Sequence, residues 1–233
     1  MISNSQTQPA SKDAQPVSKE QWREEMRRRL SAIVASYSPS GSSPLANSLA
    51  EPTGVHDHSH PASRASRIAE SLNQILSSRP GLWLSFLPTH DEPTLPTEVD
   101  GVRFAYPRLS SSGHDMKFYE CTAAEFGEVC LVVGRFGLRE PDVEHSHWRE
   151  VGDLKQGYEQ VRGALIPGLA FDRQLRRLGR GAGFYDRFLK DSTYFKVGVG
   201  FSEQLVDELP IEPHDIKLDG LVTDKEVIWK VGS

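Results

Sequence analysis

Short runs of mostly apolar residues recur along this chain and limit the folds that it can adopt. The run Leu82–Leu87 indicates a buried strand, Val129–Val133 is another short apolar run, and Lys196–Phe201 indicates a strand. A longer run, Ala164–Phe171, is a buried strand interrupted by Pro167-Gly168. Alternating apolar residues predict further strands at Val102–Tyr106 and Met116–Phe118, and we expect Leu221–Trp229 to form a single closing strand.

Helical spacing appears between these runs. Apolar residues recur on one face within 19–34, for which Ser18 is a candidate N-cap, and within 68–76, ending near Ser78. We expect two shorter helices at Phe184–Lys190 and Glu203–Leu209. Helices alternating with buried strands predict a three-layer α/β domain.

Composition divides the chain further. Residues 1–17 are rich in Ser, Gln and Pro and predict a disordered polar tail, and 36–63 is a low-complexity insertion. We therefore expect a single domain over 18–233 that carries this insertion. No stretch of about 20 apolar residues occurs, so we expect a soluble, cytoplasmic protein with no membrane partner.

The charge balance excludes other classes of protein. The net charge of −5 and the pI of about 5.9 argue against a dedicated nucleic-acid binder. Cys121 and Cys130 show no CxxC spacing and are expected to stay reduced. The histidines of 56–60 and His145 with His147 lack the helical spacing of a zinc protease, and we assign them no role.

The segment RRLGRGAGFYD, residues 176–186, is the strongest candidate for chemistry. Gly179, Gly181 and Gly183 alternate and leave backbone N–H groups accessible to an anion just before a helix. Between 172 and 190 six basic residues face two acidic ones, a local excess of four positive charges in an acidic chain. This pattern favours a polyphosphate site, although a structural turn is the alternative for the glycines alone.

Other charged residues fit such a site. Asp186 and Asp215 are candidate Mg²⁺ ligands, with a helix-terminal charge and an Asx turn as their alternatives. Lys19 and Arg23 lie four apart and share one helix face, which is ordinarily a solvated basic face. Asp91-Glu92 follows a strand end, where a carboxylate could accept N–H donors of a heterocycle or simply charge a turn.

These motifs, in this order, resemble the 5-formyltetrahydrofolate cyclo-ligase family, also called 5,10-methenyltetrahydrofolate synthetase. The stretch IPGLAFDRQLRRLGRGAGFYDRFL, residues 166–189, carries most of the likeness, and 86–92, 106–108, 136–141 and 213–219 support it. The likeness covers about 18–224 apart from the insertion. It implies a three-layer α/β/α sandwich with a mixed sheet, related to the NagB/RpiA/CoA-transferase group.

The resemblance also implies roles for individual residues. Arg180 would be catalytic, and Asp186 and Asp215 would hold Mg²⁺. The ATP-binding residues would be Lys19, Arg23, Arg177, Leu178, Gly179, Arg180, Gly181, Ala182, Gly183, Phe184 and Tyr185. The folate would contact Leu87, Glu92, Arg180, Gly181, Ala182, Gly183 and Phe184.

The implied reaction converts 5-formyltetrahydrofolate and ATP to 5,10-methenyltetrahydrofolate, ADP and phosphate. Because oxide is a poor leaving group, ATP must first phosphorylate the formyl oxygen, and this step needs alignment and charge neutralisation rather than a protein nucleophile. Ala182 departs from members that carry Lys, and Phe184 replaces a common Tyr. We expect a monomer with a small-molecule substrate and no nucleic-acid partner.

Two other readings stay open on the sequence. In the first, the chain is a paralogue that acts on another formyl or amide substrate. In the second, it is a non-catalytic folate- or nucleotide-binding regulatory module.

Overall fold

The computed structural model describes residues 18–37, 61–110, 113, 115–122, 126, 130–145, 147–152, 161–210, 212 and 215–230. The predicted tail, 1–17, and residues 38–60 of the predicted insertion lie outside these ranges. The described flanks of the insertion are helical, because α1 (Lys19–Tyr37) continues past Ser36 and α2 (Pro61–Ser77) begins at Pro61. The division into tail, insertion and one domain stays a prediction.

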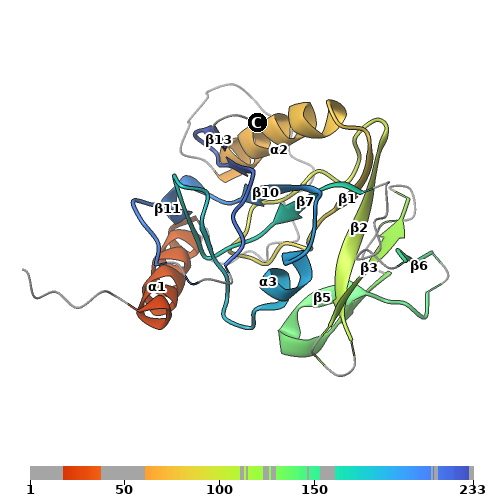
Figure 1. The fold of residues 1–233 in the computed structure, drawn as a ribbon, viewed down its shortest axis with the longest axis horizontal. Helices are drawn as coiled ribbons and strands as arrows, with labels where there is room; N and C mark the ends of the chain where they lie inside the picture. Colours follow the sequence, from red (N-terminus) through yellow and green to blue (C-terminus); the bar gives the residue numbers. More distant parts are fainter. Residues whose placement is uncertain are drawn as a thin grey trace, which may run out of the picture.

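Eight strands form one mixed sheet in the order β13-β12-β10-β7-β1-β2-β3-β6 (Figure 1). From β12 to β2 all neighbours are parallel, whereas β13, β3 and β6 join antiparallel at the two edges. The strands are β1 (Gly81–Leu84), β2 (Val102–Leu109), β3 (Met116–Cys121), β6 (Arg149–Glu150), β7 (Val161–Ile166), β10 (Phe195–Val199), β12 (Gly220–Val222) and β13 (Val227–Trp229).

Two smaller sheets extend the fold. One has the order β11-β8-β9 and comprises β8 (Ala170–Asp172), β9 (Arg177–Leu178) and β11 (Leu205–Val206). The other is the hairpin of β4 (Leu131–Val133) and β5 (Arg139–Pro141). The predicted break at Pro167-Gly168 is confirmed, because it separates β7 of the large sheet from β8 of the small one.

Helices cover both faces of the large sheet. On one face Ile68 and Leu72 of α2 pack in one core cluster with Trp83 of β1. On the other, Leu189 of α3 (Phe184–Leu189) packs with Leu84 and Ile166. Figure 1 shows α2 and α3 on opposite sides of β10, β7 and β1. The predicted α/β fold with a large mixed sheet is therefore confirmed.

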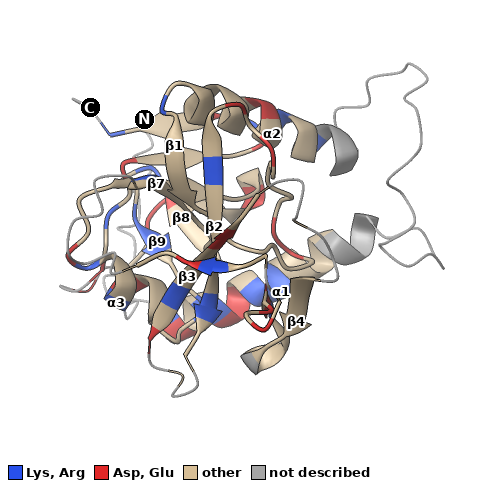
Figure 2. Cartoon of the chain, turned by 90° about the vertical axis from the view of Figure 1, so that its right-hand side faces the viewer, with Lys and Arg blue, Asp and Glu red and all other residues tan. Residues whose placement is uncertain are grey.

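The first helix packs elsewhere. Met26 and Leu30 of α1 are buried against Leu169, Ala170 and Leu178, so α1 covers the small sheet and lies beside β11 (Figure 1). Blue and red bands along α1 mark its charged face (Figure 2). The predicted N-cap is confirmed, because the Ser18 hydroxyl accepts the N–H of Gln21 at 3.3 Å while the Ser18 N–H donates to the Gln21 side chain.

Two expectations were wrong. Glu203–Leu209 is not a helix but a 3₁₀ turn, η4 (Ser202–Gln204), followed by β11, which pairs with β8. The buried Gln204 side chain donates to the Gly168 carbonyl at 2.6 Å, which holds the chain in a turn, and Pro210 disfavours helical backbone at Leu209.

The second error concerns the closing strand. Leu221–Trp229 is a hairpin of β12 and β13 rather than one strand. The Thr223 hydroxyl accepts the backbone N–H groups of Lys225 and Glu226 and so reverses the chain between β12 and β13.

None of the described helices combines the length and the apolar character that crossing a membrane requires.

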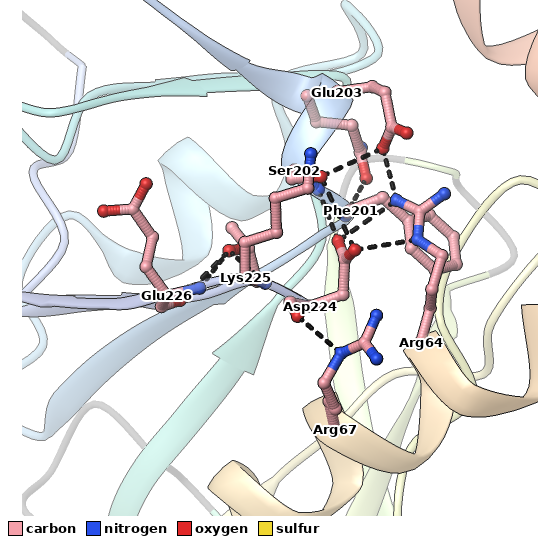
Figure 3. A network of polar contacts seen from close by, with 10 residues as sticks. Arg64, Arg67, Phe201, Ser202, Glu203, Asp224, Lys225 and Glu226 are labelled. Carbon is pink, nitrogen blue, oxygen red and sulfur yellow. Dashed lines mark hydrogen bonds and ion pairs between the residues drawn. The ribbon is translucent and has the colours of Figure 1, made fainter. Parts of the chain in front are cut away.

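A buried ion pair fixes the start of α2 on the sheet (Figure 3). Arg64 Nε donates to Asp224 at 2.7 Å, and both side chains are at most 5% exposed. Arg64 also contacts Glu203, while Arg67 donates to the Asp224 carbonyl at 2.9 Å. Burial opposes ionisation of Asp224, but Arg64 and the Ser202 N–H hold its pKa below its usual range.

We predict that Arg64→Ala lowers the free energy of unfolding by about 3–5 kcal/mol, because it leaves the Asp224 carboxylate buried and uncompensated. Urea denaturation at pH 7 measures the loss. Arg173→Ala, which breaks the exposed pair with Glu226, is the matched control and should change stability little. An Arg64 variant as stable as the control would contradict a structural role for this pair.

Candidate active site

A cavity of about 450 Å³ opens at the carboxyl ends of β1, β2 and β7. One part of its wall is apolar and is formed by Phe86, Leu87, Pro107, Leu109, Phe136, Leu138 and Phe184. The other part is polar and includes Thr89, Glu92, Glu140, Arg177, Arg180 and Asp186 together with the backbone of the glycine loop. Ligands of open α/β sheets bind at such strand ends, and the volume suits one small organic molecule.

The glycine loop, residues 179–183, connects β9 to α3. Gly181 and Gly183 have φ angles of +110° and +67°, in the region that side chains with a Cβ rarely adopt. The loop is also crowded by arginines: a Cβ on Gly183 would lie 3.0 Å from Arg187 Nη1. The glycines therefore let the backbone turn tightly among basic side chains.

The basic row of α1 reaches this loop. Arg23 Nε donates to the Gly179 carbonyl at 3.2 Å, and Arg27 Nη2 donates to the Arg180 carbonyl at 3.2 Å. Lys19 is clamped by Asp215 at 2.6 Å and by Glu212 at 2.9 Å. The row is thus not simply a solvated face, since Lys19 and Arg23 dock α1 against the loop regions that the sequence singles out.

Arg177 and Asp186 form a pair on the polar wall. Arg177 Nη2 lies 2.8 Å from Asp186 Oδ1, and Arg177 Nη1 donates to the Pro167 carbonyl at 3.1 Å. Tyr185 stands beside them, and burial, with a smaller effect from Glu92, raises the pKa of its phenol so that it stays protonated. The pair joins the glycine loop to the break between β7 and β8.

Arg180 crosses from the glycine loop to the loop after β1. Its Nη2 donates to Asp91 at 2.8 Å and to Glu92 and the Thr89 hydroxyl at 3.1 Å each. Glu92 also accepts the Thr89 N–H at 2.9 Å. Two motifs that the sequence keeps about 90 positions apart therefore meet at the cavity.

The two candidate metal ligands differ in their surroundings. Asp186 lines the cavity, and its Oδ2 accepts no hydrogen bond from the described residues. Both oxygens of Asp215 contact Lys19, and Asp215 is absent from the described residues that line the cavity. Magnesium commonly takes one or two carboxylates plus substrate phosphates, so Asp186 fits a Mg²⁺ ligand, whereas Asp215 is occupied by Lys19. The described ranges contain no group of three His, Cys, Asp or Glu side chains suited to a metal.

Not every predicted site residue reaches the cavity. The predicted site residues that line it are Leu87, Glu92, Arg177, Gly179, Arg180, Ala182, Gly183, Phe184, Tyr185 and Asp186. Lys19, Arg23, Leu178, Gly181 and Asp215 are not among the described lining residues, and Leu178 is instead buried in the core under α1. Their assigned roles stay predictions.

Among the wall residues for which the sequence predicted no role are Phe136, Leu138 and Glu140. These three belong to the β4–β5 hairpin, within the stretch 136–141 that carries part of the family likeness. Phe136 is 68% exposed at φ +64°, and its ring faces that of Phe184 at 6.2 Å. The signal that could have found these residues was the stretch 136–141 itself, which the family likeness already includes.

Glu140 is the buried acid of this wall. Its carboxylate lies over Gly134, where a Cβ would come within 2.2 Å of Glu140 Cδ. Burial raises the pKa of Glu140 above its usual range, and the Leu109 N–H and the charge of Arg108 oppose this only in part.

The protein is thus an α/β protein whose cavity lies at parallel strand ends, beside a basic glycine loop. The profile of the 5-formyltetrahydrofolate cyclo-ligase family matches residues 94–224. The chain belongs to this family.

Individual relatives agree with this assignment. The chain is 40% identical over 100 residues to a 5-formyltetrahydrofolate cyclo-ligase of Mycolicibacterium smegmatis, covering 42% of this chain and 48% of the relative. It is 36% identical over 114 residues to a probable 5-formyltetrahydrofolate cyclo-ligase of Schizosaccharomyces pombe, covering 43% and 53%. The matched part thus spans about half the length of these curated relatives.

Solved structures show the same fold. The 5,10-methenyltetrahydrofolate synthetase of Aquifex aeolicus superimposes with a TM-score of 0.60 at 24% identity, covering 91% of this chain and 94% of the other. The synthetase of Mycoplasma pneumoniae gives a TM-score of 0.57 at 20% identity, covering 88% and 98%.

The raised pKa of Glu140 predicts a pH-dependent effect of Glu140→Gln. The folded state keeps this proton to a higher pH than the unfolded chain does, so Glu140 costs stability as the pH rises through its folded-state pKa. Gln carries no such cost. Urea unfolding from pH 4 to pH 8 should therefore show the variant gaining stability relative to the native chain with rising pH. A gap that is constant or shrinks with pH would contradict the burial argument.

Proposed function

We propose that this protein closes the ring of 5-formyltetrahydrofolate with ATP, giving 5,10-methenyltetrahydrofolate, ADP and phosphate. The observation that carries the proposal is the meeting of Arg180, from the glycine loop, with Glu92, from the loop after β1, on one cavity wall. One group belongs to a predicted phosphate site and the other to a predicted folate site. Their contact suits a reaction in which ATP and folate must touch.

The apolar wall fits the folate. Leu87, Phe136 and Phe184 offer flat apolar surface to the pterin and aryl rings. Asp91 and Glu92 share one guanidinium, so this cluster keeps a net negative charge. Each carboxylate oxygen can accept more than one hydrogen bond, and Glu92 can therefore receive ring N–H donors while it still contacts Thr89.

The polar wall fits the transferring phosphoryl group. Phosphoryl transfer depends on alignment and on neutralising the charge of the phosphoryl oxygens. Arg180 and the backbone N–H groups of the glycine loop would supply this charge stabilisation beside the formyl oxygen. When bound, Mg²⁺ would neutralise the β- and γ-phosphates, with Asp186 as its protein ligand.

The balance of atoms defines the bond changes that the protein residues must assist. The formyl oxygen takes the γ-phosphoryl group, N10 attacks the formyl carbon, N10 loses its proton, and phosphate leaves with the oxygen. No covalent bond to protein forms, which agrees with the lack of Ser, Thr and Cys among the predicted site residues. The apolar wall would exclude water from the activated formyl group.

A turnover assay tests the proposal. Purified protein, 5-formyltetrahydrofolate, ATP and Mg²⁺ are mixed, and the near-ultraviolet band of the methenyl product is followed. The band should grow only with ATP and metal, so reactions without ATP or with EDTA are the controls. A flat trace from folded protein that binds ATP would favour a paralogue with another substrate, and one without ATP binding would favour a regulatory module.

We predict that Arg180→Ala and Asp186→Ala each lower kcat on the order of 10²–10³-fold, because each removes charge stabilisation at the transferring group. Thermal unfolding should show that both variants still fold. Arg173→Ala, an exposed arginine paired with Glu226, is the control and should turn over normally. Unchanged rates in both site variants would refute the site assignment.

A gain of binding is predicted for Ala182→Lys. Ala182 is exposed and lines the cavity, so the new ammonium can reach a bound phosphate without displacing core atoms. The KM for ATP should fall several-fold, while the KM for 5-formyltetrahydrofolate changes little. Ala182→Gln is the uncharged control. If both substitutions alter the KM for ATP equally, charge is not the cause.

A further inference from the structure

Arg180 uses only part of its donor set for contacts with protein. All three of its hydrogen bonds, to Thr89, Asp91 and Glu92, leave from Nη2. A guanidinium carries five N–H donors in a rigid planar fork. The donors on Nε and Nη1 therefore have no acceptor in the described part of the chain, although Arg180 lines the cavity.

Asp91 is the fixed member of this contact. Only 7% of Asp91 is exposed, whereas 42% of the Arg180 side chain is exposed on a glycine-rich loop. The Thr89 hydroxyl also bonds Asp91 and so orients its carboxylate. Burial by itself would raise the pKa of Asp91, but the Thr89 hydroxyl and Arg180 hold it below its usual range. Asp91 thus presents a buried and oriented negative charge to Arg180.

The geometry points to Asp91 as a positioning residue: it anchors Arg180 through Nη2 and leaves Nε and Nη1 free to bind the oxygens of the transferring phosphoryl group. This inference rests on the proposed function. It also gives Asp91 and Glu92 different roles. Glu92 lines the cavity and can contact a ligand directly, whereas Asp91 is not among the described lining residues and acts through Arg180.

The expected kinetic effect is a loss in kcat. Without the anchoring charge, Arg180 samples other orientations, and Asp91→Asn should lower kcat about 10- to 100-fold. The KM for 5-formyltetrahydrofolate should change less than about threefold, since Asp91 does not contact the ligand. Asp91→Glu keeps the charge and should recover part of the rate. Glu98→Gln, an exposed carboxylate in the same loop, is the matched control and should keep the native rate.

A double-mutant cycle with Arg180→Ala is the decisive test. If Asp91 acts only through Arg180, then Asp91→Asn should cost nothing further in the Arg180→Ala background. A purely structural role would give the same loss in both backgrounds. Additive losses, or a native kcat for Asp91→Asn, would overturn the inference. If Asp91→Asn does not fold, Thr89→Val removes the orienting hydroxyl, leaves both carboxylates, and enters the same cycle.

A binding cycle separates this inference from the proposed function. Titration of the same four proteins with AMP-PNP, read by calorimetry, requires no turnover. Weaker AMP-PNP binding by each single variant, with no further loss in the double variant, would support the inference. This holds even if the native protein forms no methenyl product, because the missing product would refute only the proposed function. Additive losses of AMP-PNP affinity would overturn the inference whether or not the protein turns over.

Discussion

The parallel pairing of β7, β1 and β2 determines where the cavity forms. Parallel strands place their carboxyl ends at one edge, and the chain leaves β1, β2 and β7 at this edge at Ser85, Ser110 and Pro167. The helices α2 and α3 bury the two faces and thereby fix the sheet. Because both faces are covered, the strand-end edge is left for a cavity, and its wall comes from segments remote in sequence.

Ion pairs then fix the loops that the sheet brings together. Arg177 with Asp186 and Arg180 with Asp91 hold the glycine loop against the strand ends. Lys19 with Asp215 holds α1 beside it. Each pair is part-buried, so removing either partner leaves a poorly solvated charge and costs more than the loss of an exposed pair. The loop is positioned by compensated charges, and Arg180, which has donors left over, lines the cavity.

Local patterns in the sequence predict most of the elements but not which of them meet. The stripes within 19–34 and 68–76 and the break at Pro167-Gly168 are local signals, and the structure confirms them. The helix predicted over Glu203–Leu209 does not form because the Gln204 side chain donates to the Gly168 carbonyl, 36 positions away. The pairing of Arg180 with Asp91, 89 positions apart, likewise cannot be read from one sequence, because it follows from the strand order. Family likeness supplied the roles, and the structure supplied the partners.

Hydrogen–deuterium exchange with and without AMP-PNP and 5-formyltetrahydrofolate tests where these two ligands bind. Backbone amides of 86–92 and 179–184 should exchange more slowly when both ligands are present, because residues of both segments line the same cavity. Protection confined to other segments, such as 102–106 and 121–122 around the second, smaller cavity near β3, would contradict the account.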